Sequence, residues 1–386
     1  MTDVGATHGQ VAKLTAADPD AVDKFGLTVA IAGDTVVIGA YKDDDAGSGS
    51  GSAYIFRTTD DWDTHVEIKL TAADAAAGDT FGQSVAMDGG TVVVGATKAG
   101  TGGAVYFFRT IDGGTTYDQV AKLSADDAAA SDKFGFSVAI DGDRVVVGAT
   151  GAGTGGGVYF FQMSDDGATS DQVAKLSAAD AANDDGFGWS VDIDGDTVVV
   201  GAVGNDDAGT DDSTDSGSAY VFLTSDGGAT YDQVAKLTAA DTAAGDSFGN
   251  SVVIASDKVV VGAWYKDSFT GSAYVFALAA SSPAPTAAPI ASRHFESDNI
   301  VASDGAAGDW FGVSAAVDGD VLAVSAPIHN GYKGAVYVSR TSDGGVTYVE
   351  AAALTHPEYA DGTCAATCGG ANTCDDYSAP ATPARS

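Results

Sequence analysis

Cysteine is almost missing from this sequence. Its three cysteines, Cys364, Cys368 and Cys374, lie close to the C-terminal end, so no disulfide can stabilise residues 1–355. The chain also has no run of about 18 consecutive apolar residues, which excludes a transmembrane helix. Residues 1–10 lack the basic and apolar regions of a signal peptide. Either the protein is not secreted by that route, or its natural start lies elsewhere.

Basic residues are scarce as well: 18 Lys and Arg stand against 54 Asp and Glu, a formal net charge of −36. Such a charge repels nucleic acids and anionic membranes, and it suits divalent cations, a cationic partner or a saline medium. The simpler alternative is that it keeps the protein soluble. Glutamate occurs only at Glu67, Glu296, Glu350 and Glu358, so aspartate supplies nearly all the acid. Because aspartate favours turns, the charge is expected at the loop tips of an all-β protein.

A long repeat dominates what the sequence does contain. Each copy holds, in order, a Phe-Gly pair, a Val-Gly-Ala or related run, a Gly-Ser-Ala-Tyr-Val-Phe or related run, and a Val-Ala-Lys-Leu-Thr-Ala-Ala-Asp or related run. The pairs begin at Phe25, Phe81, Phe134, Phe187, Phe248 and Phe311. In the second copy these runs predict four short strands, at 83–87, 91–96, 104–108 and 120–124. Repeated four-strand units predict a β-propeller of four-stranded antiparallel blades, with six blades in residues 1–355.

The Phe-Gly pair has a structural interpretation. The aromatic ring is expected to fill the space between adjacent blades, and the glycine to let the backbone turn in tightly at the innermost strand. Residues 11–15 read as a fourth strand with no preceding blade, which we expect to close the ring by pairing with the last blade. Residues 348–355 read as a fourth strand for that same blade. One of the two is redundant, or a seventh blade is missing.

These motifs resemble the FG-GAP repeat family, whose best-known members are the propeller heads of integrin α chains. The resemblance covers roughly residues 11–355 and implies a propeller, seven blades being the integrin norm, with a role in adhesion or binding. Integrin-type repeats often carry a calcium loop between the first and second strands. The matching turns here, such as Asp88-Gly89-Gly90, are too short to supply the oxygen ligands. Calcium is therefore not expected in these turns.

A second resemblance concerns the turn between the third and fourth strands. Thr110–Tyr117, Thr224–Tyr231 and Thr341–Tyr348 are similar to the Asp-box of sialidase-type propellers. That resemblance implies a hairpin whose aspartate accepts backbone hydrogen bonds, placed away from any active site. It supports a propeller and implies nothing about catalysis.

No catalytic constellation stands out. Arg57, Arg109 and Arg340 follow the third strand at equivalent positions, so they are expected on the outside. The histidines have no zinc-ligand spacing, and His329 reads as a solvated loop residue. Two carboxylates could still form a pair among so many aspartates. We therefore favour a non-catalytic module, with a glycan-active hydrolase or lyase as the alternative.

The loops between the second and third strands vary while the strands do not, and they are expected to project from one face. A protein or glycan ligand would bind there through aromatic residues, for which the candidates are Tyr41, Trp264, Tyr265, Phe269 and Tyr332. Acidic loops in blades one and four could hold calcium weakly, or else are simply solvated; their candidate ligands are Asp43, Asp44, Asp45, Asp206 and Asp207. No other cofactor is expected.

Two segments depart from the repeat. Residues 279–291, rich in Pro, Ala and Ser, read as a flexible loop insertion in blade five, and residues 356–386 as a cysteine-containing tail. The aspartate bias, the cysteine-free body and the adhesion-type repeat favour a secreted or surface-displayed protein. The absence of a recognisable signal peptide argues against that location.

Overall fold

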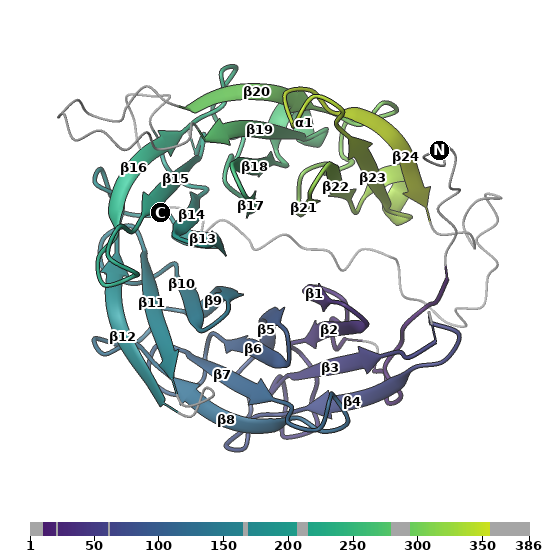
Figure 1. The fold of residues 1–386 in the computed structure, drawn as a ribbon, viewed down its shortest axis with the longest axis vertical. Coiled ribbons are helices and arrows are strands. Elements are labelled where there is room, and N and C mark those ends of the chain that lie inside the picture. The colour runs from purple at the N-terminus through teal and green to yellow at the C-terminus, as the bar shows by residue number, and fades with distance from the viewer. Residues whose placement is uncertain are drawn as a thin grey trace, which may run out of the picture.

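The computed structural model describes residues 11–20, 22–60, 62–164, 169–206, 215–278 and 294–355. These residues form six four-stranded antiparallel sheets set around a common centre, which confirms a six-bladed β-propeller (Figure 1). In each blade the strands are hydrogen-bonded in sequence order, with the first strand innermost.

The strands of the first three blades are β1 (Val29–Ala32), β2 (Thr35–Ala40), β3 (Ser52–Arg57) and β4 (Val66–Leu70); β5 (Phe81–Asp88), β6 (Thr91–Ala96), β7 (Ala104–Arg109) and β8 (Asp118–Leu123); β9 (Phe134–Asp141), β10 (Arg144–Ala149), β11 (Gly157–Ser164) and β12 (Thr169–Leu176). Those of the last three are β13 (Phe187–Asp194), β14 (Thr197–Ala202), β15 (Ser218–Leu223) and β16 (Asp232–Leu237); β17 (Val252–Ala255), β18 (Lys258–Ala263), β19 (Ser272–Leu278) and β20 (His294–Ile300); β21 (Ala315–Asp318), β22 (Val321–Ala326), β23 (Ala335–Arg340) and β24 (Val349–Thr355).

The second and third strands of blades one to five are almost wholly buried, because neighbouring strands and neighbouring blades cover both of their faces, whereas β22 and β23 of blade six are buried only in part. In blade two, for example, β6 and β7 are buried along nearly their whole length, whereas the outer strand β8 is mostly half-buried. Continuous β-branched runs such as Thr91–Ala96 suit that environment.

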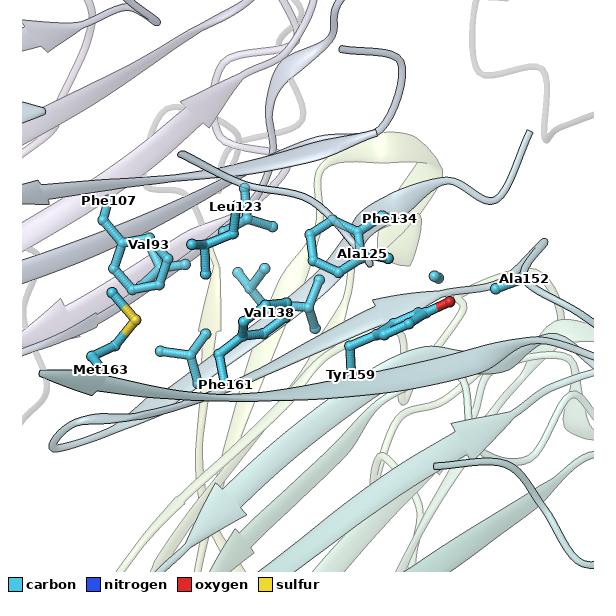
Figure 2. Close-up of a cluster of buried hydrophobic side chains, with 14 residues drawn as sticks. Val93, Phe107, Leu123, Ala125, Phe134, Val138, Ala152, Tyr159, Phe161 and Met163 are labelled. Carbon is cyan, nitrogen blue, oxygen red and sulfur yellow. The ribbon is translucent and has the colours of Figure 1, made fainter. Parts of the chain in front are cut away.

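In blades two to six the phenylalanine of the Phe-Gly pair is buried between two blades, as expected, whereas Phe25 of blade one packs within its own blade and against Leu14 and Ala16. Phe134 is fully buried and packs edge-on against Tyr159 and Phe161 of its own blade, with ring centroids 5.4 and 5.8 Å apart. On its other side it belongs to a cluster with Phe107 and Leu123 of blade two (Figure 2). The ring therefore joins the cores of adjacent blades.

In blades two to six the glycine of the pair permits a close approach to the preceding blade. At Gly135 φ is +88°, a left-handed conformation that disfavours other residues. The carbonyl oxygen of Gly135 lies only 2.1 Å from where a Cβ on Gly95 of the preceding blade would stand. Glycine is thus required on both sides of this contact, in the Phe-Gly pair and in the Val-Gly-Ala run.

The predicted ring closure is wrong for the described residues. Residues 11–15 belong to no strand, and the fourth strand of blade six is β24, which pairs with β23. The two short helices, α1 (Lys266–Phe269) and α2 (His329–Tyr332), each contain residues with left-handed φ and ψ and amount to tight turns. Within the described residues no helix combines the length and apolar character needed to span a membrane.

The blade-to-blade phenylalanines predict a large effect of truncation. Phe187 is fully buried and contacts Tyr220 and Phe222, so Phe187→Ala should lower the free energy of unfolding by about 3–5 kcal/mol. Chemical denaturation would measure the loss. In the matched control, Ile111→Ala, the side chain is 89% exposed, and the change should stay within about 0.5 kcal/mol. Equal effects of the two substitutions would contradict this role for the ring.

Candidate functional site

The loops between the second and third strands all leave the same face of the disc, because every blade has the same strand order and direction. On this face the structure brings together three of the predicted aromatic residues. Trp264, Tyr265 and Phe269 are joined by ring contacts with centroids 4.0 to 6.0 Å apart. Tyr265 is 37% exposed, and the other two are half-buried.

A fourth aromatic residue, Trp310, completes this group and was missed by the sequence analysis. Its ring lies 4.6 Å from that of Trp264 and is nearly parallel to that of Phe269 at 6.4 Å. It comes from the connector that enters blade six. One sequence feature could have identified Trp310: it stands directly before Phe311, where the other copies carry no aromatic residue. We call Trp264, Tyr265, Phe269 and Trp310 the aromatic cluster.

A buried lysine, Lys266, fixes the loop that carries three residues of the aromatic cluster. The Lys266 side chain is 7% exposed, and its Nζ bonds Asp246 Oδ2 at 3.1 Å and the carbonyl of Asp241 at 2.6 Å. The backbone N–H of Trp310 donates to the backbone carbonyl of Phe269 at 2.9 Å. The loop is therefore fixed both to its own blade and to the next connector.

The other two predicted aromatic residues lie elsewhere. Tyr41 is on blade one, half-buried, with Lys42 Nζ 5.9 Å from its ring centroid. Tyr332 lies in α2 of blade six, and its side chain is outside the described set.

The acidic loop of blade one surrounds a cation supplied by the protein itself. Asp18, Asp43 and Asp45 bring carboxylate oxygens within 4.8 Å of one another. Lys69 Nζ bonds all three, at 2.7 Å to Asp18 and 2.9 Å to Asp43, and lies 5.1 Å from the centroid of the Tyr54 ring. Two predicted calcium ligands, Asp43 and Asp45, thus bind a lysine.

The titration behaviour of this group agrees with its geometry. The hydrogen bond from Lys69 is the main cause that lowers the pKa of Asp18. Burial acts to raise the pKa of Asp43, but hydrogen bonds from Lys69, the Asp45 N–H and Tyr54 outweigh it and leave that pKa lowered. Both carboxylates are therefore held in the charged form that lysine requires.

A similar arrangement recurs around the ring, but the element that contacts the connector aspartate changes from blade to blade. In blades one to four a fourth-strand lysine lies opposite the third-strand tyrosine; these pairs are Lys69–Tyr54, Lys122–Tyr106, Lys175–Tyr159 and Lys236–Tyr220. In blades five and six that position holds Asn299 and Ala353. In these two blades the aspartate of the preceding connector meets a loop side chain instead, Lys266 in blade five and His329 in blade six.

His329 corrects the sequence analysis, which took it for a solvated loop residue. It is only 5% exposed, and its Nδ1 lies 2.9 Å from Asp309 Oδ2. The Tyr337 hydroxyl lies 3.3 Å from the same nitrogen, and Asp304 lies 3.6 Å from Nε2. In copies one to four the equivalent lysine belongs to the fourth strand, so the position of His329 could be recognised only by comparison with Lys266 of copy five.

The remaining acidic candidates serve as caps within their own loops. Asp44 accepts a hydrogen bond from the Gly49 N–H at 2.6 Å, and Asp206 accepts one from the Asp215 N–H at 2.8 Å. Asp207 lies outside the described residues.

The turns between third and fourth strands are also capped by aspartate. Asp226 accepts hydrogen bonds from the Thr230 hydroxyl at 2.7 Å and from the Thr230 N–H at 2.9 Å. These bonds, with one from Thr224, lower the pKa of Asp226 to about 2. Asp112 and Asp343 make the same bonds in blades two and six. Each of these carboxylates is fully used in holding its turn.

One carboxyl group behaves differently. Asp192, on the innermost strand β13, accepts a hydrogen bond from the Ile254 N–H of blade five at 2.7 Å. Burial raises its pKa to about 7, and the nearby charges of Asp194 and Asp141 add to the effect. Burial and these neighbouring charges account for the shift, and the interblade hydrogen bond from Ile254 acts against it.

Comparison with known proteins gives a consistent result. A model of the FG-GAP repeat matches residues 8–56, 65–108, 117–161, 166–222, 231–276 and 295–339. No curated protein sequence matches the chain. Among solved structures, the chain is similar to one from Bacteroides uniformis named as a 6-phosphogluconolactonase, with 12% identity and a TM-score of 0.54 over 85% of this chain and 84% of that one. At that identity the likeness extends to the fold alone.

Asp192 predicts a specific pH dependence. Because its pKa is about 7 in the folded protein and ordinary when unfolded, its contribution to stability is complete below about pH 4 and is lost as the pH rises to 7. The loss should reach about 4 kcal/mol. Asp192→Asn should abolish this component. The variant should therefore become more stable relative to the unchanged protein as the pH rises from 4 to 7. Denaturation at several pH values measures this. The exposed Asp118→Asn should show no such gain; parallel curves for both variants would contradict the assignment.

Lys69 predicts how blade one responds to calcium. The unchanged protein should show little rise in melting temperature with calcium, because Lys69 occupies the space between the carboxylates. Lys69→Gln should lower the unfolding free energy by about 2–4 kcal/mol, since it leaves Asp43 charged and nearly buried. Calcium should then restore part of the loss. A large fall in the melting temperature of the unchanged protein on chelation would show that calcium binds and that this account is wrong.

Proposed function

The chain belongs to the FG-GAP repeat family, and from that premise we propose that it is a non-catalytic binding module. Its ligand is a protein or a glycan, bound on the face formed by the loops between second and third strands. The observation that carries the proposal is the aromatic cluster, which gathers four rings from two blades on that face.

The aromatic cluster suits binding because it is partly exposed and already ordered. Tyr265 presents 37% of its surface, next to Trp264 and Phe269. Lys266 fixes the loop through bonds to Asp241 and Asp246. A ligand therefore does not need to order these side chains, which lowers the entropic cost of association. Aromatic rings of this kind supply much of the binding energy at protein and glycan interfaces.

The division between constant strands and variable loops also supports this proposal. The buried runs Thr91–Ala96, Arg144–Ala149 and Thr197–Ala202 are nearly identical. The loops that follow the second strands differ in length and composition from blade to blade. A scaffold that fixes its strands and varies the loops of one face presents a recognition surface.

The charge of the protein narrows the class of partner. A net charge of −36 opposes nucleic acids and direct contact with anionic membranes. We extend the proposal to a secreted or surface-displayed protein with a role in adhesion, and to calcium as a weak ligand at most.

Binding assays on immobilised glycans and on immobilised surface proteins of the native cell would test this proposal directly. We expect one of these ligands to retain the protein. Tyr265→Ala or Trp264→Ala should weaken that binding by about 10- to 100-fold, since each removes an aromatic contact. Calorimetry with the retained ligand measures the change. Tyr41→Ala, a loop aromatic on blade one, is the matched control and should bind normally.

Three outcomes would redirect the proposal. Binding that survives both substitutions would move the site away from the aromatic cluster. Loss of binding together with a lowered melting temperature would indicate damage to the fold, so circular dichroism accompanies each variant. Turnover of a glycoside with no retained partner would favour a glycan-active enzyme instead.

A further inference from the structure

The aspartate of the preceding connector meets a lysine in five blades and a histidine in the sixth. The five ion pairs are Lys69–Asp18, Lys122–Asp74, Lys175–Asp127, Lys236–Asp180 and Lys266–Asp241. In blade six the equivalent carboxylate is that of Asp304, whose Oδ2 lies 3.6 Å from His329 Nε2. That separation is too long for a good hydrogen bond. An imidazole therefore stands where the other blades place a permanent positive charge.

A buried carboxylate fixes the orientation of this imidazole. His329 Nδ1 lies 2.9 Å from Asp309 Oδ2, and both side chains are nearly buried. Because an ionised carboxylate can only accept a hydrogen bond, this contact assigns the ring proton to Nδ1. Nε2 is then an acceptor, and the side-chain amide of Asn330 lies 2.8 Å from it. A histidine that is held by a carboxylate through one ring nitrogen and offers the other is the usual arrangement in metal sites.

The Asp304 carboxylate is held in place as well. The Tyr337 hydroxyl donates to Asp304 Oδ1 at 2.6 Å, which leaves Oδ2 on the side of His329 Nε2. In a tetrahedral zinc site, oxygen and nitrogen ligands each lie about 2.1 Å from the metal, so two of them are about 3.4 Å apart. The observed 3.6 Å between Nε2 and Oδ2 is close to that spacing. The two donor atoms are therefore already placed to share one metal ion.

Asn330 supplies a third donor next to these two. It follows His329 in α2 and is exposed, so its side chain has room to turn. A half-turn of the amide group places Oδ1 where Nδ2 now lies, 2.8 Å from His329 Nε2. An imidazole nitrogen, a carboxylate oxygen and an amide oxygen form a set that divalent transition metals accept. Because the Asp304 side chain is 58% exposed, water can complete the coordination.

We propose that blade six carries a zinc site, in which His329 Nε2, Asp304 Oδ2 and the side-chain oxygen of Asn330 bind the metal ion. Asp309 and Tyr337 are positioning residues, since each holds one of these ligands by a hydrogen bond. The bound ion supplies beside Asp304 the positive charge that lysine supplies in the other blades, and it ties α2 to the connector. The imidazole ligand favours zinc over calcium and magnesium, which prefer oxygen donors alone.

Calorimetric titration with zinc tests this proposal at about pH 7.5, where an ordinary imidazole is neutral. The full chain carries Cys364→Ser, Cys368→Ser and Cys374→Ser, so that thiolates cannot bind the metal. Excess magnesium is present to occupy the many surface carboxylates. We expect one equivalent of zinc to bind and the melting temperature to rise with zinc concentration. Absence of a saturable one-equivalent site would overturn the proposal.

Substitution of His329 by lysine separates metal binding from a merely structural role. His329→Lys gives blade six the residue that blade five has at this position, where Lys266 Nζ lies 3.3 Å from Asp241 Oδ2. Without zinc, this variant should therefore melt at nearly the same temperature as the unsubstituted protein. It should lose the zinc site, because an ammonium group has no lone pair for a metal. Zinc binding that persists in this variant would overturn the proposal.

A matched pair of tyrosine variants tests the positioning of Asp304. Tyr337→Phe removes only the hydroxyl that holds Asp304, and zinc affinity should fall by about 10-fold, as is usual when a ligand loses such a partner. Tyr274→Phe is the control, because its hydroxyl donates to Asp241 of blade five at 2.8 Å, and zinc affinity should not change. Equal losses in the two variants would place the zinc outside blade six and overturn the proposal.

Discussion

The contact between two glycine backbones, one from each of two adjacent blades, is the constraint on which this propeller depends. The carbonyl oxygen of Gly188 lies 2.1 Å from the point where a Cβ on Gly148 would stand, so any other residue there must force the blades apart. Once the backbones meet, the adjoining Phe187 lies against the cores of both blades. The glycines set the spacing of the blades, and the phenylalanine supplies the buried apolar surface that stabilises it.

A second requirement follows from this packing. The third-strand tyrosines are buried, and in blades one, three, five and six the hydroxyl donates to the aspartate of the preceding connector, as Tyr159 does to Asp127. In blades one to four a fourth-strand lysine lies beside that carboxylate. In blades five and six a loop side chain lies there instead, Lys266 or His329. These two side chains also contact a buried carboxylate, Asp246 or Asp309, and so hold the loop to the scaffold.

Sequence reasoning identified the fold because the fold repeats. Phe-Gly pairs, buried runs and turn residues recur, and each copy confirms the others, so strand order and blade number could be predicted. The cation contacts could not, because Lys266 and Lys69 occupy different sequence positions while meeting equivalent carboxylates. Trp310 was missed for a similar reason: it joins Trp264 across a blade boundary, and nothing in a single copy indicates which neighbouring loop it meets. Pairings between copies depend on three-dimensional register, which local patterns do not carry.

The exceptional interface between blades six and one follows from the same local rules. Each interface needs an outer-strand end beside the phenylalanine, a glycine against the inner turn, and covered valines on the first strand. Blade one has the first of these from Leu14 and Ala16 and lacks the other two among the described residues. Val29 and Ile31 therefore remain exposed, which is costly for a protein otherwise so well packed. Because Leu14 and Ala16 already pack with Phe25 and Tyr54, they take the place that the end of a fourth strand takes at the other interfaces, and no hydrophobic cluster of the described residues joins blade six to blade one.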